Sequence, residues 1–397
     1  MKDIYIFKAK KLYAKLQGEE YFLYKNNEFI LSNENISEIL DILPEGIDLK
    51  IMLEAFNAKK AIELLPYLKN TIGDFEFCAS MDVNALKPKL STLLLDDSFP
   101  NILECKIDIK EQILAPISRT KQQAQKLSLS GYQHKIQACI IDGVIMQDYG
   151  DFILKPRNPK FSNLAVNEHL NLSFMREFGF EVPFNALVFD ERFRDYHYLI
   201  KRFDINERGE KIPLISLNAL MRSEDKYSGT MDKIADFLSS KLNKAQKLAF
   251  VRYIYANALL FNNDLHKKNI SFVFDKDKLM LSPAYDIINA YPIRALANTQ
   301  CALTINGRLN DIRIRDFENI SKKLGLDFIA VQNELKQILK IYLDLYPSYI
   351  EKLSKIPQIN GLKEFKSKLL ESYAKCLRTA KIENILSEIL QQNNQTR

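Results

Sequence analysis

The sequence predicts an α+β fold with two lobes, preceded by a small α+β unit. The chain has 397 residues, more than a single hydrophobic core usually holds, so two or three packed units are expected. Residues 127–205 alternate between strand-like runs and one helical pattern, whereas the chain after residue 230 is mostly helical. A strand-rich piece followed by a helical piece is typical of a two-lobed architecture with a cleft between the lobes.

The composition is that of a folded globular protein, with 47% hydrophobic and 27% charged residues. No run reaches the roughly 18 uninterrupted apolar residues that a membrane span needs, and the N-terminus lacks the apolar segment of a secretory signal. The five cysteines and four histidines show no zinc-ligand spacing. We therefore expect a reduced, cytoplasmic protein without membrane contact or structural zinc. The net charge of +6 is well mixed and does not by itself indicate nucleic-acid binding.

The chain divides into three predicted units: 1–112, 113–205 and 206–397. In the first unit, strand-like runs at 21–24 and 29–31 flank a polar tetrapeptide and predict a β-hairpin. Helical patterns follow near 36–43 and 50–70. The first boundary is placed just before segment 115–125, because that segment is polar and weakly patterned.

The second unit is predicted to hold strands and one helix. Its strand-like runs are 136–146, 152–155, 184–189 and 196–203. Gly143 marks a turn in the first of these, and the helical pattern of 164–178 stops at Gly179, a common residue just past a helix end. The third unit has helical patterns at 230–241, 244–260, 314–324, 328–345 and 360–390. Two short strands, 270–274 and 279–282, interrupt these helices and predict a hairpin.

A small-residue loop is the first candidate functional feature. None of the 12 glycines forms G-x-G-x-x-G or G-x-x-x-x-G-K-[ST], so the usual dinucleotide and Walker A loops are absent. The segment 128–135 offers a different loop. A turn at Ser130 and Gly131 can aim backbone N–H groups at phosphate oxygens, and the hydroxyls of Ser128 and Ser130 add donors. The alternative is an ordinary turn.

Oxygen-bearing side chains flank the predicted hairpin. Asp264 and Asn269 precede it, and Asp286 follows it. Because a hairpin brings its two ends together, Asn269 and Asp286 can meet at one point, and hard oxygen ligands suit Mg²⁺ that carries a nucleotide's phosphates. Asp264 could then accept a proton from an attacking hydroxyl. The alternative is that all three are polar loop residues that cap the hairpin ends.

A lysine and a glutamate form the third candidate feature. Lys155 ends the strand 152–155, and Glu168 falls among the apolar positions of the following helix. A buried carboxylate is costly unless it is paired, so Lys155 is its expected partner. A Lys–Glu pair that positions phosphates recurs in kinases. The alternative is a glutamate at the edge of the core whose carboxylate reaches water.

The order of these features along the chain resembles that of a protein-kinase-like site. The sequence is similar to the HipA family of serine/threonine protein kinases, the toxins of HipBA-type type II toxin–antitoxin systems. Five segments carry the resemblance, and the family pattern that each one matches is given in parentheses: 128–135 (S-x-x-G-x-Q-x-K), 167–168 (N-E), 201–204 (R-F-D, preceded here by Lys201), 264–269 (D-G-H-x-K-N, with Leu265 at the glycine) and 283–287 (P-x-Y-D-I). The resemblance spans roughly residues 115–345. It implies a bilobal fold with a small β-rich N-lobe and a helical C-lobe, after a small α+β N-terminal subdomain.

The resemblance also implies roles for the matched residues. Asp264 is the implied catalytic aspartate that orients and deprotonates the acceptor hydroxyl, and Lys268 adds positive charge near the transferring phosphoryl group. Asn269 and Asp286 are the implied Mg²⁺ ligands, and Lys155 contacts the ATP phosphates.

Further implied roles concern the nucleotide and autophosphorylation. The backbone around Lys201–Phe203 reads adenine, and Asp204 lies near the ribose. Ser130 and Gly131 belong to the ATP-binding loop. Ser128 sits at the position that family members autophosphorylate, with Ser130 as the alternative acceptor. A phosphate there adds about −1.5 to −2 charge and is expected to switch the kinase off by drawing the loop out of its ATP-binding arrangement.

Two positions depart from the family pattern. Leu265 stands where the family has glycine after the catalytic aspartate. Lys201 begins segment 201–204, which is the hinge of the family, at a position where acidic residues are common. Neither change removes a group that the chemistry needs. We therefore predict an ATP- and Mg²⁺-dependent serine/threonine kinase that acts on a protein substrate as a growth-arresting toxin. A helix-turn-helix antitoxin is the expected partner, with DNA contacted only through it. The alternatives are a catalytically weak co-repressor module and a kinase that acts on a small molecule.

Overall fold

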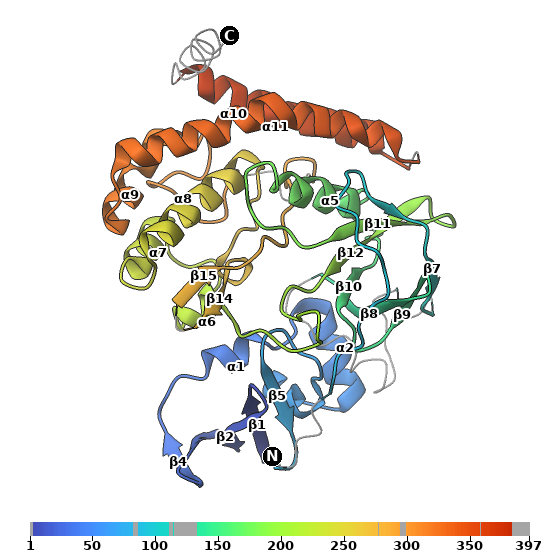
Figure 1. Cartoon of the computed structure of the whole chain (residues 1–397), viewed down its shortest axis with the longest axis vertical. Helices are drawn as coiled ribbons and strands as arrows, with labels where there is room; N and C mark the ends of the chain where they lie inside the picture. Colours follow the sequence, from blue (N-terminus) through green and yellow to red (C-terminus); the bar gives the residue numbers. More distant parts are fainter. Residues whose placement is uncertain are drawn as a thin grey trace.

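The computed structural model describes residues 3–81, 86–110, 114, 133–276, 278–293, 299–357 and 359–382. An N-terminal sheet lies at one end of the molecule, and helices α10 (Phe328–Lys352) and α11 (Leu362–Ile382) lie at the opposite end (Figure 1). A seven-stranded sheet and a helical lobe lie between them. The predicted α+β, two-lobed fold class is confirmed. No helix in these described ranges is long and apolar enough to cross a membrane.

The N-terminal sheet has five antiparallel strands in the order β4-β3-β2-β1-β5. Their bounds are β1 Ile4–Lys8, β2 Lys11–Gln17, β3 Glu20–Lys25, β4 Glu28–Ser32 and β5 Phe75–Cys78. The predicted hairpin is confirmed, with Lys25 opposite Glu28 in β3 and β4. Asn26 and Asn27 adopt φ values of 52° and 65°, because a two-residue hairpin loop requires left-handed backbone that asparagine tolerates.

Three short helices follow β4 in this unit: α1 Ser37–Asp41, α2 Gly46–Phe56 and the 3₁₀ helix η1 Ala61–Tyr67. The predicted helical stretch over 50–70 is wrong in its extent. Asn57 adopts φ 52° as a left-handed cap and ends α2. The chain then starts again as η1, so the helical residues form two elements with different directions.

The seven-stranded sheet has the order β6-β11-β12-β10-β8-β9-β7. Its strands are β6 Ile102–Leu103, β7 Lys106–Asp108, β8 Ile136–Ile141, β9 Val144–Gln147, β10 Phe152–Lys155, β11 Asn185–Asp190 and β12 Asp195–Lys201. The predicted strand 136–146 is two strands, because Asp142 and Gly143 take φ values of 49° and 74° and reverse the chain. Strands β6 and β7, which precede residue 112, belong to this sheet, and the predicted boundary after residue 112 stays a prediction. The two sheets also share one hydrophobic core.

Helix α5 (Leu164–Phe174) packs against β11 and β12 on one side and against α10 on the other. It ends four residues before the predicted end, and the chain continues in turns to Gly179. Its polar side chains are buried and therefore need partners. The Asn101 N–H donates to His169 Nε2 at 3.0 Å, and His169 Nδ1 lies 2.7 Å from Asn185 Oδ1. Burial lowers the pKa of His169 to about 4, so this histidine is neutral at pH 7.

The helical lobe also carries a three-stranded sheet in the order β13-β14-β15. The strands are β13 Leu214–Ser216, β14 Ser271–Asp275 and β15 Lys278–Leu281. The remaining helical elements are α6 Leu217–Leu220, α7 Met231–Leu238, α8 Lys244–Leu259, η2 Lys267–Asn269, η3 Ile314–Phe317, α9 Glu318–Leu324 and η4 Leu353–Lys355. Thr230, Asn243 and Asp327 cap α7, α8 and α10 through their side-chain oxygens. The predicted β14–β15 hairpin is confirmed, whereas α10 continues past the predicted end at 345.

Gly150, between β9 and β10, lies too close to the backbone of β8 to carry a side chain. A Cβ built on Gly150 lies 1.9 Å from the carbonyl oxygen of Ala138 in β8. Gly150→Ala should therefore lower the free energy of unfolding by more than about 3 kcal/mol, because the clash is with backbone. Gly143→Ala is the control, since its Cβ meets open space and its positive φ costs only about 1–2 kcal/mol. Equal losses for the two variants in urea denaturation would contradict this account.

Candidate active site

Three elements bring one lysine and two carboxylates together beneath the seven-stranded sheet. Lys155 ends β10, Glu168 lies on α5, and Asp286 follows β15. Lys155 Nζ lies 2.6 Å from Glu168 Oε1 and also pairs with Asp286 Oδ1. Lys135 Nζ adds a longer contact of 3.9 Å to Asp286 Oδ2. The expected Lys155–Glu168 pair is present, and Asp286 joins it.

The electrostatics of this cluster follow from its burial. The Lys155 and Glu168 side chains are 4% and 1% exposed. Burial opposes the charge of Lys155, but the Asp286 and Glu168 carboxylates outweigh it and raise the pKa of Lys155. Burial raises the pKa of Glu168 to about 7, against the attraction of Lys155. For Asp286 the two lysines outweigh burial and lower the pKa of its carboxyl. The cluster thus holds a charged lysine and an ionised aspartate at neutral pH.

Tyr285 links the Asp286 segment to the preceding loop. Its hydroxyl donates to the carbonyl oxygen of Lys268 at 3.0 Å and lies 2.6 Å from Ser271 Oγ, which can donate to it. Asp286 itself adopts φ 57°, an uncommon conformation for a residue with a Cβ and one found more often at functional sites. The Phe203 ring lies 5.7 Å from the Tyr285 ring, centroid to centroid. Tyr285 is the tyrosine of the matched segment 283–287, and the sequence assigned it no separate role.

The loop 264–269 is tied internally by hydrogen bonds. The Asn269 amide donates to the carbonyl oxygen of Asp264 at 2.9 Å, and the His266 N–H donates to the same oxygen at 2.7 Å. The left-handed residue near this loop is Phe261, with φ 55°. Leu265 is 3% exposed and packs in the core of the helical lobe. Leucine in place of the family glycine therefore adds core contact without forcing a left-handed residue at this position.

Asp264 presents a carboxylate that is 42% exposed. Tyr227, from the loop after α6, donates its hydroxyl to Asp264 Oδ1 at 2.8 Å. His266 Nε2 lies 3.8 Å from the same oxygen. Burial lowers the pKa of His266 against the pull of Asp264, so burial disfavours a charged pair between this imidazole and the carboxylate. The contact from Tyr227 has no signal in the sequence that we recognised.

Mg²⁺ suits the donors that two of these residues offer. The Asn269 amide nitrogen is bound to Asp264, and among the described residues no donor reaches its Oδ1. The Asp286 carboxylate is ionised. An amide oxygen and a carboxylate are hard donors of the kind that Mg²⁺ takes in nucleotide sites, with phosphates and water completing its shell. Within the described ranges, no three His, Cys, Asp or Glu side chains gather as a metal site.

Lys268 forms ion pairs with the N-terminal unit, and its role near a transferring phosphoryl group stays a prediction. Its Nζ lies 2.6 Å from Glu45 Oε1 and 3.2 Å from Asp41 Oδ1. Lys226 binds the other Glu45 oxygen at 2.8 Å. Burial opposes ionisation of Glu45, but Lys226 and Lys268 outweigh it and lower the pKa of Glu45 to about 2. Two cations beside the proposed base are thus held by acidic residues from a distant part of the chain.

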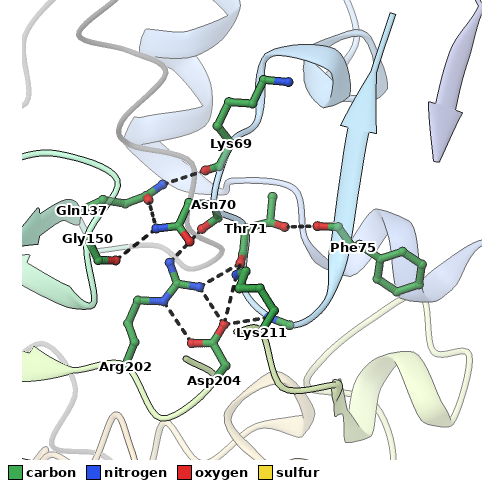
Figure 2. Close-up of polar contacts among 10 residues, drawn as sticks. Lys69, Asn70, Thr71, Phe75, Gln137, Gly150, Arg202, Asp204 and Lys211 are labelled. Atoms are coloured by element: carbon green, nitrogen blue, oxygen red, sulfur yellow. Dashed lines mark hydrogen bonds and ion pairs between the residues drawn. The ribbon is translucent and has the colours of Figure 1, made fainter. Parts of the chain in front are cut away.

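Asp204 is bound by groups of the chain itself, and its place near a ribose stays a prediction. Figure 2 shows its carboxylate in a buried cluster with Arg202, which binds both Asp204 oxygens at 2.9 and 2.6 Å. The Gly73 N–H donates to Asp204 Oδ2 at 2.9 Å. Arg202 also donates to the carbonyl oxygens of Asn70 and Thr71 at 2.7 and 2.8 Å. Asp204, together with Arg202, therefore binds the loop 70–73 of the N-terminal unit.

The backbone of the predicted hinge, 201–204, already makes a hydrogen bond within the protein. The Lys201 N–H donates to the carbonyl oxygen of Phe184 at 2.8 Å, within the seven-stranded sheet. Three predicted positions, Ser128, Ser130 and Gly131, lie outside the described residues, so the proposed phosphate-binding loop and its phosphorylation stay predictions.

The fold and this cluster of groups define a protein of the kinase-like class. A lysine on a strand pairs with a helix glutamate, and an aspartate follows a hairpin after a polar loop, which are the parts that position phosphates in kinases. Residues 127–345 match the family described as the HipA-like C-terminal domain. That match covers more than half of the chain, so the protein belongs to this family, as its motifs predicted.

Two relatives agree with this assignment, and one solved structure shares the fold. A protein of Haemophilus influenzae named "Putative kinase" is 30% identical over 261 residues, which are 60% of this chain and 76% of the relative. A second relative with a kinase name, from Sinorhizobium fredii, is 26% identical over 245 residues, and the match spans 58% of it. The Shewanella oneidensis HipA chain, solved with HipB and operator DNA, has the same fold. It has a TM-score of 0.69 at 18% identity and covers 94% of this chain and 97% of its own.

The Arg202 cluster predicts a large stability effect. Arg202→Met leaves the buried Asp204 carboxylate with Lys211 alone among its side-chain partners and should lower the free energy of unfolding by about 3–5 kcal/mol. Removing the carboxylate as well, in Arg202→Met with Asp204→Leu, should recover part of this loss. Guanidinium denaturation measures both variants, and an Arg202→Met midpoint equal to wild type would contradict the role assigned to the cluster.

The Glu45 contacts predict a pH dependence. Glu45→Gln should lower the free energy of unfolding by about 1–2 kcal/mol at neutral pH, after allowance for solvent screening. The folded-state pKa of about 2 lies below the ordinary 4.5, so ionised Glu45 stabilises the fold above about pH 4.5 and loses this effect as the pH falls toward 2. The difference between wild type and variant should shrink over that range. Exposed Glu207→Gln is the control, and a difference between wild type and Glu45→Gln that is independent of pH would refute the assignment.

Proposed function

We propose that this protein is an ATP- and Mg²⁺-dependent serine/threonine protein kinase of the HipA type. The observation that carries the proposal is the Lys155 ammonium held between Glu168 and Asp286, beside a loop that presents an accessible carboxylate at Asp264. In this arrangement Lys155 is a cation for phosphates, the Asp286 carboxylate is a ligand for a metal ion, and Asp264 is a base for a hydroxyl. Each is needed for phosphoryl transfer.

The proposed mechanism uses each group once. Lys155 binds phosphate oxygens of the nucleotide, and Glu168 holds the ammonium in place. Asn269 and Asp286 are the residues that would hold Mg²⁺, which supplies charge neutralisation to the phosphates when bound. Asp264 accepts the proton of the acceptor hydroxyl as that oxygen attacks the γ-phosphorus. Positioning and electrostatic stabilisation account for most of the rate in this chemistry.

The biological role proposed is that of a growth-arresting toxin with a protein target. The family assignment supports it, and the solved HipA relative is described together with HipB and operator DNA. For the present chain we propose a helix-turn-helix antitoxin as partner, with DNA reached through that partner. Autophosphorylation at Ser128 or Ser130 is the proposed regulation.

Labelled ATP with Mg²⁺ tests the catalytic proposal directly. Wild type should transfer label to its own chain, and Asp264→Asn should reduce the rate by roughly 10²–10⁴-fold, the usual contribution of a general base. Asp275→Asn, at the far end of the β14–β15 hairpin, is the matched control and should label at the wild-type rate. Equal labelling of wild type and Asp264→Asn would refute the mechanism. Nucleotide binding without any transfer would favour the co-repressor alternative.

A further inference from the structure

The Tyr227 hydroxyl occupies the position that an acceptor hydroxyl needs. It donates to Asp264 Oδ1 at 2.8 Å, within the range over which a general base takes a proton. The tyrosine is 47% exposed, so its hydroxyl reaches the carboxylate from the solvent side. No other hydroxyl in the described part of the chain donates to Asp264.

Several contacts hold Tyr227 in this place. Its ring meets the His266 ring edge-on, with centroids 4.9 Å apart. Its N–H donates to Asp225 Oδ1 at 2.9 Å. On either side of it, Lys226 binds Glu45 at 2.8 Å and Ser228 Oγ accepts from Lys267 at 2.9 Å. The tyrosine is thus positioned by the N-terminal unit and by the loop that carries Asp264.

We propose that Tyr227 is an internal phosphoryl acceptor of this protein. The inference rests on the kinase function proposed above. The Tyr227 oxygen attacks the γ-phosphorus of a bound nucleoside triphosphate and forms a new P–O bond. The bond between the γ-phosphorus and the β–γ bridging oxygen breaks, and its electron pair leaves with the nucleoside diphosphate. The phenolic proton passes to the Asp264 carboxylate, which already accepts it in a hydrogen bond.

The modification would also change access to the base. A phosphate on tyrosine carries about −1.5 to −2 charge, and it would lie beside the ionised Asp264. Repulsion between the two groups moves the tyrosine away and exposes the carboxylate to an external hydroxyl. Gly229, with φ +93° and no heavy atom within 4 Å of an added Cβ, gives the loop backbone room to turn. Tyr227 in its unmodified form therefore competes with a protein substrate.

Mass spectrometry of the full-length protein tests this proposal. After incubation with ATP and Mg²⁺, trypsin releases residues 227–233, Tyr-Ser-Gly-Thr-Met-Asp-Lys, and fragmentation separates Tyr227 from Ser228 and Thr230. Phosphate is expected on Tyr227 in wild type and is expected to be absent from Asp264→Asn. The initial rate per molecule should not depend on protein concentration, because acceptor and base belong to one chain.

Two variants complete the design. Tyr227→Phe keeps the ring contact to His266 but removes the acceptor, so label in this peptide should disappear. Tyr67→Phe changes another exposed tyrosine, which stacks on Phe56 in the N-terminal unit, and should label as wild type does. Thermal denaturation checks that each variant is folded.

The outcomes separate this inference from the kinase proposal. Phosphate on other residues, with none on Tyr227, overturns the inference and leaves the kinase function standing. Phosphate on Tyr227 at a per-molecule rate that rises with protein concentration also overturns it, because the acceptor would then come from another copy. A protein that transfers no phosphate to itself or to any added protein overturns both proposals.

Discussion

The ammonium of Lys155 is the group on which the arrangement of the site depends. It is buried and bound to carboxylates from two other elements, so β10, α5 and the segment after β15 must meet at one point. Removing the ammonium of Lys155 would leave the buried Glu168 carboxyl without its cation, which is far more costly than breaking a surface pair. Asn167 strengthens the same junction, because its amide exchanges two hydrogen bonds of 2.8 Å with the backbone of Asn289. Helix α5 therefore joins the end of β10 to the segment after β15.

The N-terminal unit contacts residues of the proposed site directly. Acidic residues of its helices reach three basic groups near the proposed catalytic loop: Asp41 and Glu45 bind Lys268, Glu45 binds Lys226, and Asp48 pairs with His134 at 2.6 Å. On the other side, the loop 70–73 holds Arg202 and Asp204. A movement of this unit would thus act on the hinge and on the catalytic loop together.

Local signals in the sequence predicted those parts of the site that are close along the chain. The β14–β15 hairpin, the loop 264–269 and the Lys155–Glu168 pair follow from turn residues, strand patterns and the cost of burying a carboxylate. Lys268 and Asp204 could not be placed in this way, since their partners Glu45 and Gly73 lie more than one hundred residues away. The burial of α5 on all sides was missed for a related reason, because its second neighbour, α10, comes much later in the sequence.

The two carboxylates on Lys155 are not equivalent, and this difference bears on how a nucleotide could enter. Glu168 is almost fully buried, and Lys155 is the cation it contacts, whereas the Asp286 side chain is 24% exposed and has a second lysine within 4 Å. Separating Glu168 from Lys155 would leave a buried carboxyl without its cation, whereas a displaced Asp286 keeps its contact with Lys135 and reaches solvent. On the kinase function proposed above, we expect a phosphate that binds Lys155 to displace Asp286 more easily than Glu168. The Asp286 carboxylate, next to the Tyr285 contacts, would then be free to hold the cation that accompanies the phosphate, and this would couple nucleotide and metal binding through Lys155.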